Sequence, residues 1–429
     1  MNEKLYDVWL SLRLSPSSRK YGELINYFGD AFGVYRACEE ELIFAGVGPR
    51  EAAAVADKGL DRSFEILRFC ERHGVGLLCP GDRGYPAILA GIPTPPQLLY
   101  VLGTLPDMDK KTGVGIVGTR NMSVYGMEQA YGISYCLASS GAVIVSGMAK
   151  GIDGVAAVAA IEAGGSTVAV VGTGINVVFP SEHASLAREI ACHGAIVSEY
   201  PPDSSGLSWH FPQRNRIISG LSRATVVVEA GERSGAVITA DCAFRQKRHV
   251  FAVPGNVGNP NSAGTNGLLR RGGIAALDAG DIIALLDSED EGSLSVSRFA
   301  EATLRCACDT EILGKYGVAP GKDTPGRAAQ TIRSAIPAAP VKAPVISVKR
   351  VCRQERTEEK ETCIPPAGRM RDMWSVIPEG QRVSPDYFTG KGYGIGEAMN
   401  LLSMLEISGY VKSVPGGMYE KIVSNPSAG

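Results

Sequence analysis

Two arginines separated by a single asparagine stand in the stretch Phe211-Pro-Gln-Arg-Asn-Arg-Ile-Ile-Ser219, shortly before the apolar run Thr225–Val228. A planar guanidinium binds carboxylates and phosphates through paired hydrogen bonds, and arginine is costly beside a buried strand without such a partner. The stretch is therefore a candidate for binding phosphate groups. The residues that would make the contacts are Phe211, Arg214, Asn215 and Arg216.

Further loops combine glycine with hydroxyl, amide or cationic residues. Each follows an apolar run or begins a predicted helix, where backbone N–H groups can bind an anion. Glycine after a strand is also ordinary turn chemistry, so a single loop of this kind would show little. Several at one edge of a sheet, beside the arginines, favour a phosphate-binding site. Its members would be Gly118, Thr119, Arg120, Ser146, Gly147, Lys150, Gly151, Ser234, Gly235, Asn256, Thr265 and Asn266.

The elements that must position these loops alternate between short apolar runs and helical patterns from residue 112 to about 286. Continuous β-branched runs are typical of strands that are covered on both faces. Repeated β-α units of this length predict an α/β fold with a doubly wound parallel sheet, in which ligands bind at the carboxyl ends of the strands. The predicted strands are Val114–Val117, Ala142–Val145, Thr167–Val171, Ala195–Ser198, Thr225–Glu229 and Val250–Val253, and the predicted helices are 124–138, 152–163, 182–192, 213–222 and 235–246.

Gly113-Val-Gly-Ile-Val-Gly118 satisfies the dinucleotide fingerprint G-x-G-x-x-G only literally. That fingerprint follows a strand, whereas here the apolar run lies inside the motif itself. We therefore expect no nucleotide cofactor. The cysteines Cys306, Cys308, Cys352 and Cys363 match no standard zinc spacing, so we expect no metal site either.

Candidates for catalysis are few. The chain has no H-E-x-x-H motif, no Walker loop and no evident Ser/His/Asp or Cys/His arrangement. Asp153 and Glu199 stand near strand ends and could act as acid or base, but a cap or a salt bridge to Lys150 or Arg214 is the favoured interpretation. His210 and His249 are expected to be packing or surface residues.

Length and composition indicate several domains. At 429 residues with 45% hydrophobic content, the chain can form two or three cores. We predict a small helical domain over 1–70, the sheet domain over 71–287, a flexible linker over 288–368 and a winged helix over 369–425. In the first domain, Phe44-Ala-Gly-Val-Gly-Pro-Arg50 is typical of a helix-hairpin-helix turn, and could equally be ordinary helix packing.

Charge is unevenly distributed on a nearly neutral chain. The formal net charge is −2, but residues 203–272 carry nine Lys and Arg against four acids. Such a local basic region is compatible with phosphate binding and with ordinary solvated helix faces. No apolar run approaches membrane-spanning length and no signal peptide is evident, so we expect a cytoplasmic protein without membrane contact.

Taken together, five motifs resemble those of the DNA-processing protein A (DprA/Smf) family. They are Gly118-Thr-Arg120, Ser146-Gly-Met-Ala-Lys-Gly-Ile-Asp153, Phe211–Ser219, Ser234-Gly-Ala-Val-Ile-Thr-Ala240, and Pro254-Gly-Asn256 with Gly264-Thr-Asn266. The resemblance implies an extended Rossmann-like domain between a small domain of the SAM or helix-hairpin-helix type and a winged helix.

The same resemblance implies a function. It would be a non-enzymatic protein that binds single-stranded DNA, protects incoming DNA and loads a RecA-type recombinase during natural transformation, as a homodimer formed through the Rossmann-like domain. By position, Arg120 and Lys150 would hold phosphates, and Ser234 and Gly235 would offer donors. The predicted recognition helix 396–408 departs from a DNA-binding pattern because it contains Glu397 and Glu406 but no Lys or Arg, which favours a protein-contact role.

Two alternatives stay open at this point. One is a nucleotide phosphoribohydrolase of the lysine-decarboxylase-like group, whose P-G-G-x-G-T-x-x-E motif would fall on Glu229–Ala240; the terminal glutamate is missing there. The other is a winged-helix transcription regulator with a nucleotide-sensing core. Release of a free base would support the first, and sequence-specific duplex binding the second.

Overall fold

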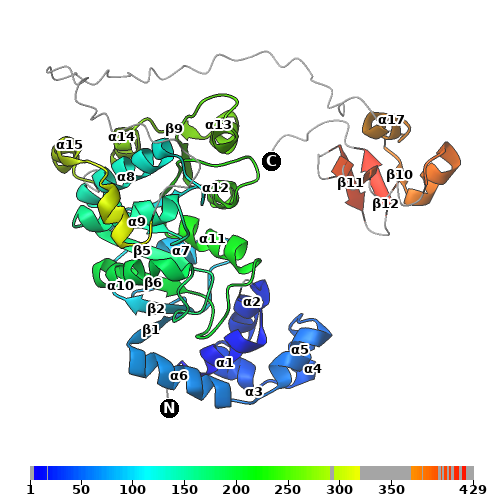
Figure 1. Ribbon diagram of the computed structural model, residues 1–429. Helices are drawn as coiled ribbons and strands as arrows, with labels where there is room; N and C mark the ends of the chain where they lie inside the picture. Colours follow the sequence, from blue (N-terminus) through cyan, green and yellow to red (C-terminus); the bar gives the residue numbers. More distant parts are fainter. Residues whose placement is uncertain are drawn as a thin grey trace. The chain divides into compact units, whose positions relative to one another are not determined.

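The structure is a computed structural model that describes residues 4–16, 18–289, 294–318, 369–378, 380–394, 398, 401–402, 405–406, 410–414 and 418–421. The chain divides into two compact units, Met1–Ala329 and Gln330–Gly429 (Figure 1). Each unit is described separately.

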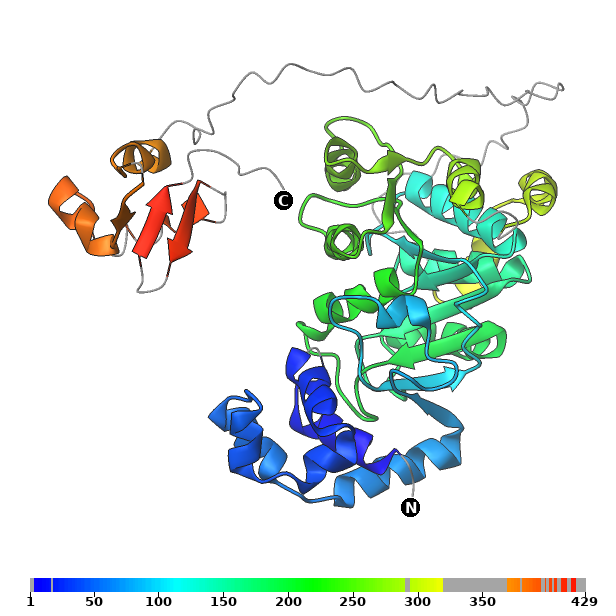
Figure 2. The same ribbon diagram turned by 180° about the vertical axis from the view of Figure 1, so that it is seen from behind.

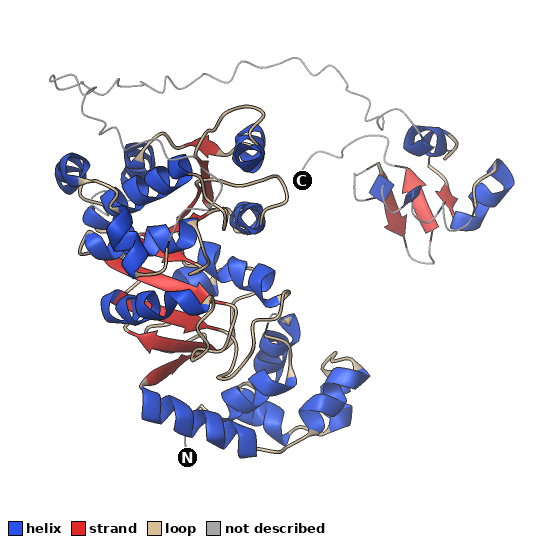
Figure 3. Cartoon of the chain, in the orientation of Figure 1, coloured by secondary structure: helices blue, strands red, loops and turns tan. Residues whose placement is uncertain are grey.

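A nine-stranded sheet forms the centre of the first unit (Figure 3). Its order is β1-β2-β6-β5-β4-β3-β7-β8-β9, and the strands from β6 to β9 in this order pair in parallel. The order reverses at β3, which lies between β4 and β7. The strands are β1 Val75–Leu78, β2 Leu99–Gly103, β3 Gly113–Val117, β4 Val143–Ser146, β5 Ser166–Val171, β6 Gly194–Ser198, β7 Ala224–Val227, β8 His249–Ala252 and β9 Ile274–Ala275.

The six predicted strands are confirmed as β3 to β8, because their apolar side chains alternate between two buried faces. In β3, for example, Val114 and Ile116 belong to one core and Val117 to the other. The apparent dinucleotide motif is strand β3 itself, as its position suggested. An added Cβ at Gly113 would come within 2.2 Å of the Leu221 carbonyl oxygen, so this glycine serves close packing.

Helices cover both faces of the sheet, which gives a three-layer α/β/α arrangement. One face packs against α8 Val124–Ser139, α9 Ile152–Glu162, α10 Ala184–His193, α14 Ala279–Glu289 and α15 Val296–Arg305. The other face packs against α7 Ala87–Ala90, α11 His210–Gly220, α12 Gly235–Arg245 and α13 Ala263–Arg270. Two short 3₁₀ turns are η1 Ser181–His183 and η2 Pro260–Ser262. The predicted Rossmann-like α/β class is therefore correct.

Two parts of the sequence prediction differ from the structure. The lead-in over 71–110 contains strands β1 and β2. β1 pairs antiparallel with β2, and β2 pairs antiparallel with β6, so the sheet is mixed at this edge. Residues 296–315, placed in the linker, form α15 and α16 Thr310–Lys315. They are ordered because Ala302, Leu313 and Val318 pack into the main core.

The N-terminal region consists of six helices gathered at the end of the sheet next to β1 (Figures 1 and 2). They bury their own core around Trp9, Leu24 and Leu42. Helices α4 and α5 flank the predicted hairpin, where Gly46 adopts a left-handed φ of 87°. The helices are α1 Leu5–Arg13, α2 Arg19–Phe28, α3 Ala31–Arg36, α4 Glu39–Phe44, α5 Pro49–Ala56 and α6 Asp61–His73.

The second unit has a three-stranded antiparallel sheet of order β10-β12-β11. Its elements are α17 Arg369–Ser375, β10 Arg382–Val383, η3 Pro385–Lys391, β11 Val411–Val414 and β12 Met418–Lys421. The β11–β12 pair matches the predicted hairpin, while its turn, most of the predicted helix 396–408, Cys352 and Cys363 lie outside the described residues. The winged-helix assignment stays a prediction. Within the described ranges, no helix is long and apolar enough to cross a membrane.

Candidate nucleic-acid interface

A hollow of about 710 Å³ opens beyond the carboxyl ends of β3 and β7, where the strand order of the sheet reverses. We call it the switch-point hollow. Ligands of open α/β sheets bind at this place because the loops of two neighbouring strands diverge there. Of the predicted residues, Gly118, Thr119, Arg120, Phe211, Arg214, Asn215, Ser234 and Gly235 line it. A small adjoining pocket is lined by Gly147 and Lys150, together with Arg120, Phe211 and Arg214.

Two glycines allow the loop after β3 to lie directly against the start of α9. A Cβ at Gly118 would stand 2.5 Å from the Ile152 side chain. Gly151 has φ of +79°, and a Cβ there would come within 2.3 Å of the Thr119 carbonyl oxygen. The Ile152 amide also donates to that oxygen at 3.2 Å. This close approach fixes the loop that carries Arg120 at the edge of the hollow.

Two exposed arginines supply positive charge to the hollow. Arg120 extends from the loop after β3, and Arg233 directly precedes the N-cap of α12. Neither has an ion-pair partner among the residues that the structure describes. Lys150 differs, because its ammonium lies 2.6 Å from the carboxylate of Glu182. The hydrogen bond from Lys150 lowers the pKa of Glu182 to about 2, so this pair is charged at neutral pH.

Aromatic and guanidinium groups meet on one wall of the hollow. The rings of Phe179 and Phe211 lie 5.5 Å apart at 44°, and the Arg120 guanidinium carbon lies 5.7 Å from the centre of the Phe211 ring. Phe179 is 49% exposed although it is a large apolar residue. Planar groups of this kind are surfaces on which nucleic-acid bases stack.

Arg214 forms the floor of the hollow and is only 4% exposed. Its guanidinium donates to the carbonyl oxygens of Gly147, at 2.9 Å, and Val170. Helix α11 is thereby attached to the ends of β4 and β5. Burial lowers the pKa of Arg214 to about 10, against the opposing effect of Asp153, so the side chain is protonated at neutral pH.

The loop after β4 does not offer free N–H donors as the sequence suggested. The carboxylate of Asp153 accepts the amides of Gly147, at 3.1 Å, and Ala149, at 3.4 Å. Burial raises the pKa of Asp153, and the nearby Arg214 and these amides oppose the rise. The chain thus places its own carboxylate in the predicted anion cradle. The role is structural, but it differs from the cap or salt bridge that we favoured, because Asp153 accepts loop amides and the N-cap of α9 is Gly151.

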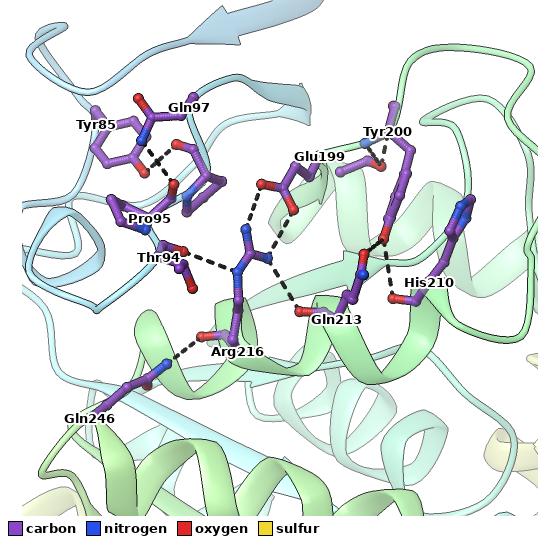
Figure 4. Close-up of polar contacts among 12 residues, drawn as sticks. Tyr85, Thr94, Pro95, Gln97, Glu199, Tyr200, His210, Gln213, Arg216 and Gln246 are labelled. Atoms are coloured by element: carbon purple, nitrogen blue, oxygen red, sulfur yellow. Dashed lines mark hydrogen bonds and ion pairs between the residues drawn. The ribbon is translucent and has the colours of Figure 1, made fainter. Parts of the chain in front are cut away.

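Arg216 does not lie in the hollow, contrary to our expectation. It points to the other side of α11, where its guanidinium binds both oxygens of Glu199, at 2.9 and 2.6 Å (Figure 4). Its Nε donates to the Thr94 carbonyl oxygen at 3.0 Å. Because the ion pair is buried, Arg216 is not available to a ligand. Asn215, between the two arginines, donates to the Gly235 carbonyl oxygen at 3.1 Å.

Five other predicted residues do not line the hollow, and most of them form hydrogen bonds or close contacts within the protein. Ser146 donates to the Ile116 carbonyl oxygen inside the sheet, and Thr265 donates to the Ser262 carbonyl oxygen. Asn266 bonds both the amide and the carbonyl of Gly255. Gly151 permits the loop contact described above, and Asn256 is exposed and is not among the residues that line the hollow. These residues are therefore left out of the site.

Sequence reasoning missed several residues of the hollow, among them Asn121, Phe179 and Arg233. Arg233 stands one position before the recognised Ser234 motif, so its proximity to that motif was an available signal. Phe179 follows β5 by eight residues, and only the folded chain shows that it meets Phe211. His210 is buried against Tyr200 with ring centres 3.9 Å apart, and burial lowers its pKa, as befits the packing role that we expected.

The fold and the hollow define a Rossmann-like α/β protein with a cationic, aromatic-lined site at its topological switch point. Residues 76–287 match the family model of DNA recombination-mediator protein A. DNA processing protein DprA of Bacillus subtilis is 40% identical over 217 residues, which cover 51% of this chain and 73% of that protein. Protein Smf of Escherichia coli is 43% identical over 210 residues, 48% of this chain and 55% of that protein.

Among solved structures, DprA from Streptococcus pneumoniae covers 66% of this chain and 98% of its own, with 30% identity and a TM-score of 0.57. The chain therefore belongs to the DNA recombination-mediator protein A family, also called DprA or Smf.

The buried Arg216–Glu199 pair gives a prediction about stability. Arg216→Met leaves the carboxyl group of Glu199 buried without its partner, and Glu199→Gln leaves the guanidinium of Arg216 without a carboxylate. Each variant should therefore lower the free energy of unfolding of the first unit by about 3 to 5 kcal/mol. The double variant Arg216→Met/Glu199→Leu should recover most of that loss. Urea denaturation followed by circular dichroism measures all three.

The matched control for this experiment is Arg62→Met, which breaks an exposed pair with Glu65 and Asp203. Its cost should not exceed about 1 kcal/mol. Single variants of Arg216 and Glu199 that are no more harmful than the control would contradict the structural role of the buried pair.

Proposed function

We propose that this protein binds single-stranded DNA in the switch-point hollow and acts, without catalysing a reaction, in DNA processing during transformation and recombination. The observation that carries the proposal is that Arg120 and Arg233, exposed and without ion-pair partners in the described chain, line the same hollow as the paired rings of Phe179 and Phe211. Cations attract the phosphate backbone, and exposed planar groups receive bases.

Phosphate attraction explains why the site needs unpaired cations. Arg120 has a fork of donors directed from a fixed loop, and Arg233 stands beside the first turn of α12, whose N-cap is Ser234. The partial positive charge of a helix N-terminus adds to the charge of the side chain. The two arginines would hold successive phosphates of a strand that passes across the hollow.

Base stacking favours a single strand over a duplex. In a duplex the bases are stacked on one another and are not accessible to Phe179 or Phe211, whereas the bases of a single strand are free to stack on aromatic rings. The Arg120 guanidinium over Phe211 enlarges the planar surface. A single strand would therefore use both the cations and the rings, and a duplex only the cations.

The wider role follows from the family. Membership among DNA recombination-mediator proteins supports the proposal that the bound strand is passed to a RecA-type recombinase and that incoming DNA is protected meanwhile. We further propose a homodimer formed through the Rossmann-like domain, in the cytoplasm, as the resemblance to DprA and Smf proteins implies. The matched segment covers 73% of the Bacillus subtilis protein and 55% of the Escherichia coli protein.

Charge reversal in the hollow gives the first test of the proposal. Arg120→Glu and Arg233→Glu should each weaken binding of a short single-stranded oligonucleotide by about tenfold or more at low salt, because a phosphate contact is replaced by repulsion. Each should also reduce the slope of log K against log salt concentration by about 0.7. Fluorescence anisotropy over a series of salt concentrations measures both quantities.

Arg188→Glu is the matched control, since Arg188 is an exposed arginine of α10 outside the hollow. It changes the net charge equally and should alter affinity by less than about twofold. Equal losses in all three variants would mean that binding follows the net charge of the protein and not the hollow.

Removal of the aromatic wall tests the preference for single strands. Phe211→Ala should weaken single-strand binding by about tenfold or more, since stacking of one base contributes about 1 to 3 kcal/mol. Binding of a duplex of the same length should change by less than about twofold. Trp209→Ala, an exposed aromatic residue outside the lining of the hollow, is the control. Parallel losses for both forms of DNA in Phe211→Ala would refute the stacking argument.

The Lys150–Glu182 pair predicts a gain of affinity. A phosphate that contacts Lys150 must compete with the Glu182 carboxylate, which lies 2.6 Å from the ammonium. Glu182→Gln should therefore tighten single-strand binding by about two- to fivefold, the range expected for one exposed ion pair. Glu162→Gln removes an exposed acid from the far end of α9 and serves as the control. Unchanged affinity in Glu182→Gln would exclude Lys150 from the phosphate path.

A further inference from the structure

A second hollow, of about 540 Å³, lies at the other edge of the sheet, beside the amino ends of β7 and β8. We call it the amino-end hollow. Three consecutive basic residues, Lys247, Arg248 and His249, line it together with Arg223, which directly precedes β7. The strands are parallel, so their full length separates this hollow from the switch-point hollow at their carboxyl ends.

Arg248 is the central residue of this hollow. One Nη donates to the Ile88 carbonyl oxygen at 3.0 Å, while its Nε is buried and has no hydrogen-bond partner among the described residues. Within the described chain, no carboxylate forms an ion pair with it. Burial lowers the pKa of Arg248, and the neighbouring charge of Arg223 lowers it further. A half-buried guanidinium without a carboxylate partner is stabilised when an anion binds it.

Lys247 adds a second cation at the edge of the hollow. It follows the C-cap of α12 with a left-handed φ of 57°, where glycine is the usual residue. The Arg248 amide donates to the Ala243 carbonyl oxygen at 2.9 Å, which closes the end of the helix. Lys247 is exposed and has no ion-pair partner in the described ranges. Its ammonium therefore stays available to an anion from solvent.

The two acidic residues of the lining are already engaged by other groups. Asp109 accepts the Ala87 amide at 2.8 Å, and Glu289 contacts the His249 imidazole at 2.9 Å. Neither forms an ion pair with Lys247 or Arg248. The geometry points to a phosphate-binding site in the amino-end hollow, in which Arg248 binds two oxygens through its fork and Lys247 contributes a point charge.

The phosphate could belong to a free nucleotide or to a DNA strand, because both present anionic phosphate oxygens. This inference does not depend on the proposed function, since none of its residues lines the switch-point hollow. If the strand is the source, the same molecule would have to extend from one edge of the sheet to the other.

The test uses the full chain with Arg120→Glu and Arg233→Glu, so that the switch-point hollow no longer contributes. Calorimetric titration with inorganic phosphate and with deoxycytidine monophosphate, at constant ionic strength, should show binding at one site. Adding Arg248→Gln should weaken it by about tenfold or more, as expected for loss of a charged, forked contact. Arg248→Lys should lose less, because the charge remains.

Arg188→Gln is the control, and thermal unfolding shows whether each variant is folded. Equal phosphate affinity in the Arg248→Gln and Arg188→Gln variants, or no phosphate binding at all in the starting variant, would overturn the inference. If the multiple variant does not fold, Arg248→Gln and Arg188→Gln are each introduced into the otherwise unaltered chain, and their phosphate affinities are compared there.

A further measurement distinguishes the two sources of phosphate. In the otherwise unaltered chain, Arg248→Gln should weaken binding of long single strands but not of short ones if the strand supplies the phosphate. If a free nucleotide is the ligand, oligonucleotides of every length should bind Arg248→Gln as they bind the unaltered chain. Either result keeps the phosphate site.

Discussion

The position of helix α11 depends on buried guanidinium groups that need partners. Arg216 is held by Glu199 and Thr94, Arg214 by the carbonyl groups at the ends of β4 and β5, and Asn215 by Gly235 at the start of α12. Removing one partner would leave a charge or donor buried without compensation. Three consecutive residues therefore attach α11 to the ends of β4, β5 and β6, to the segment of Thr94 and to the start of α12. Since α11 also carries Phe211, these contacts determine where the aromatic wall of the hollow lies.

The cations of the candidate site are of two kinds, buried ones that the protein itself bonds and exposed ones at the edge of the hollow. Arg214 and Arg216 are buried and bonded by the protein, whereas Arg120 and Arg233 are exposed on loops at the edge of the hollow. A flexible loop alone would not hold an arginine in place. Here the close approach of Gly151 to the Thr119 carbonyl, which leaves no room for a Cβ, fixes the first loop, and the Ser234 cap fixes the start of α12. Rigid backbone thus supports exposed charge, an arrangement suited to binding with little loss of entropy.

The sequence was sufficient for the sheet, but not for the orientation of individual side chains. Buried β-branched runs predicted β3 to β8, and several of the glycine loops line a hollow at the carboxyl edge of the sheet. The strands β1 and β2 were missed because they lie among prolines and glycines in 71–110. The role of Arg216 was wrong because its partner Glu199 comes from the end of β6, and no pattern along the chain shows that pairing.

Charge counted along the chain overstates the charge that a ligand meets. Arg120, Lys150, Arg214 and Arg216 suggest four phosphate contacts in the sequence. In the folded chain Glu199 neutralises Arg216, Asp153 lies beside Arg214, and Glu182 is paired with Lys150. Arg120 remains and Arg233 joins it, so the proposed site would make about two phosphate contacts and would depend only modestly on salt. A nearly neutral protein can thus present a local cationic surface, because folding pairs Lys150 and Arg216 with carboxylates and leaves Arg120 and Arg233 without ion-pair partners in the described chain.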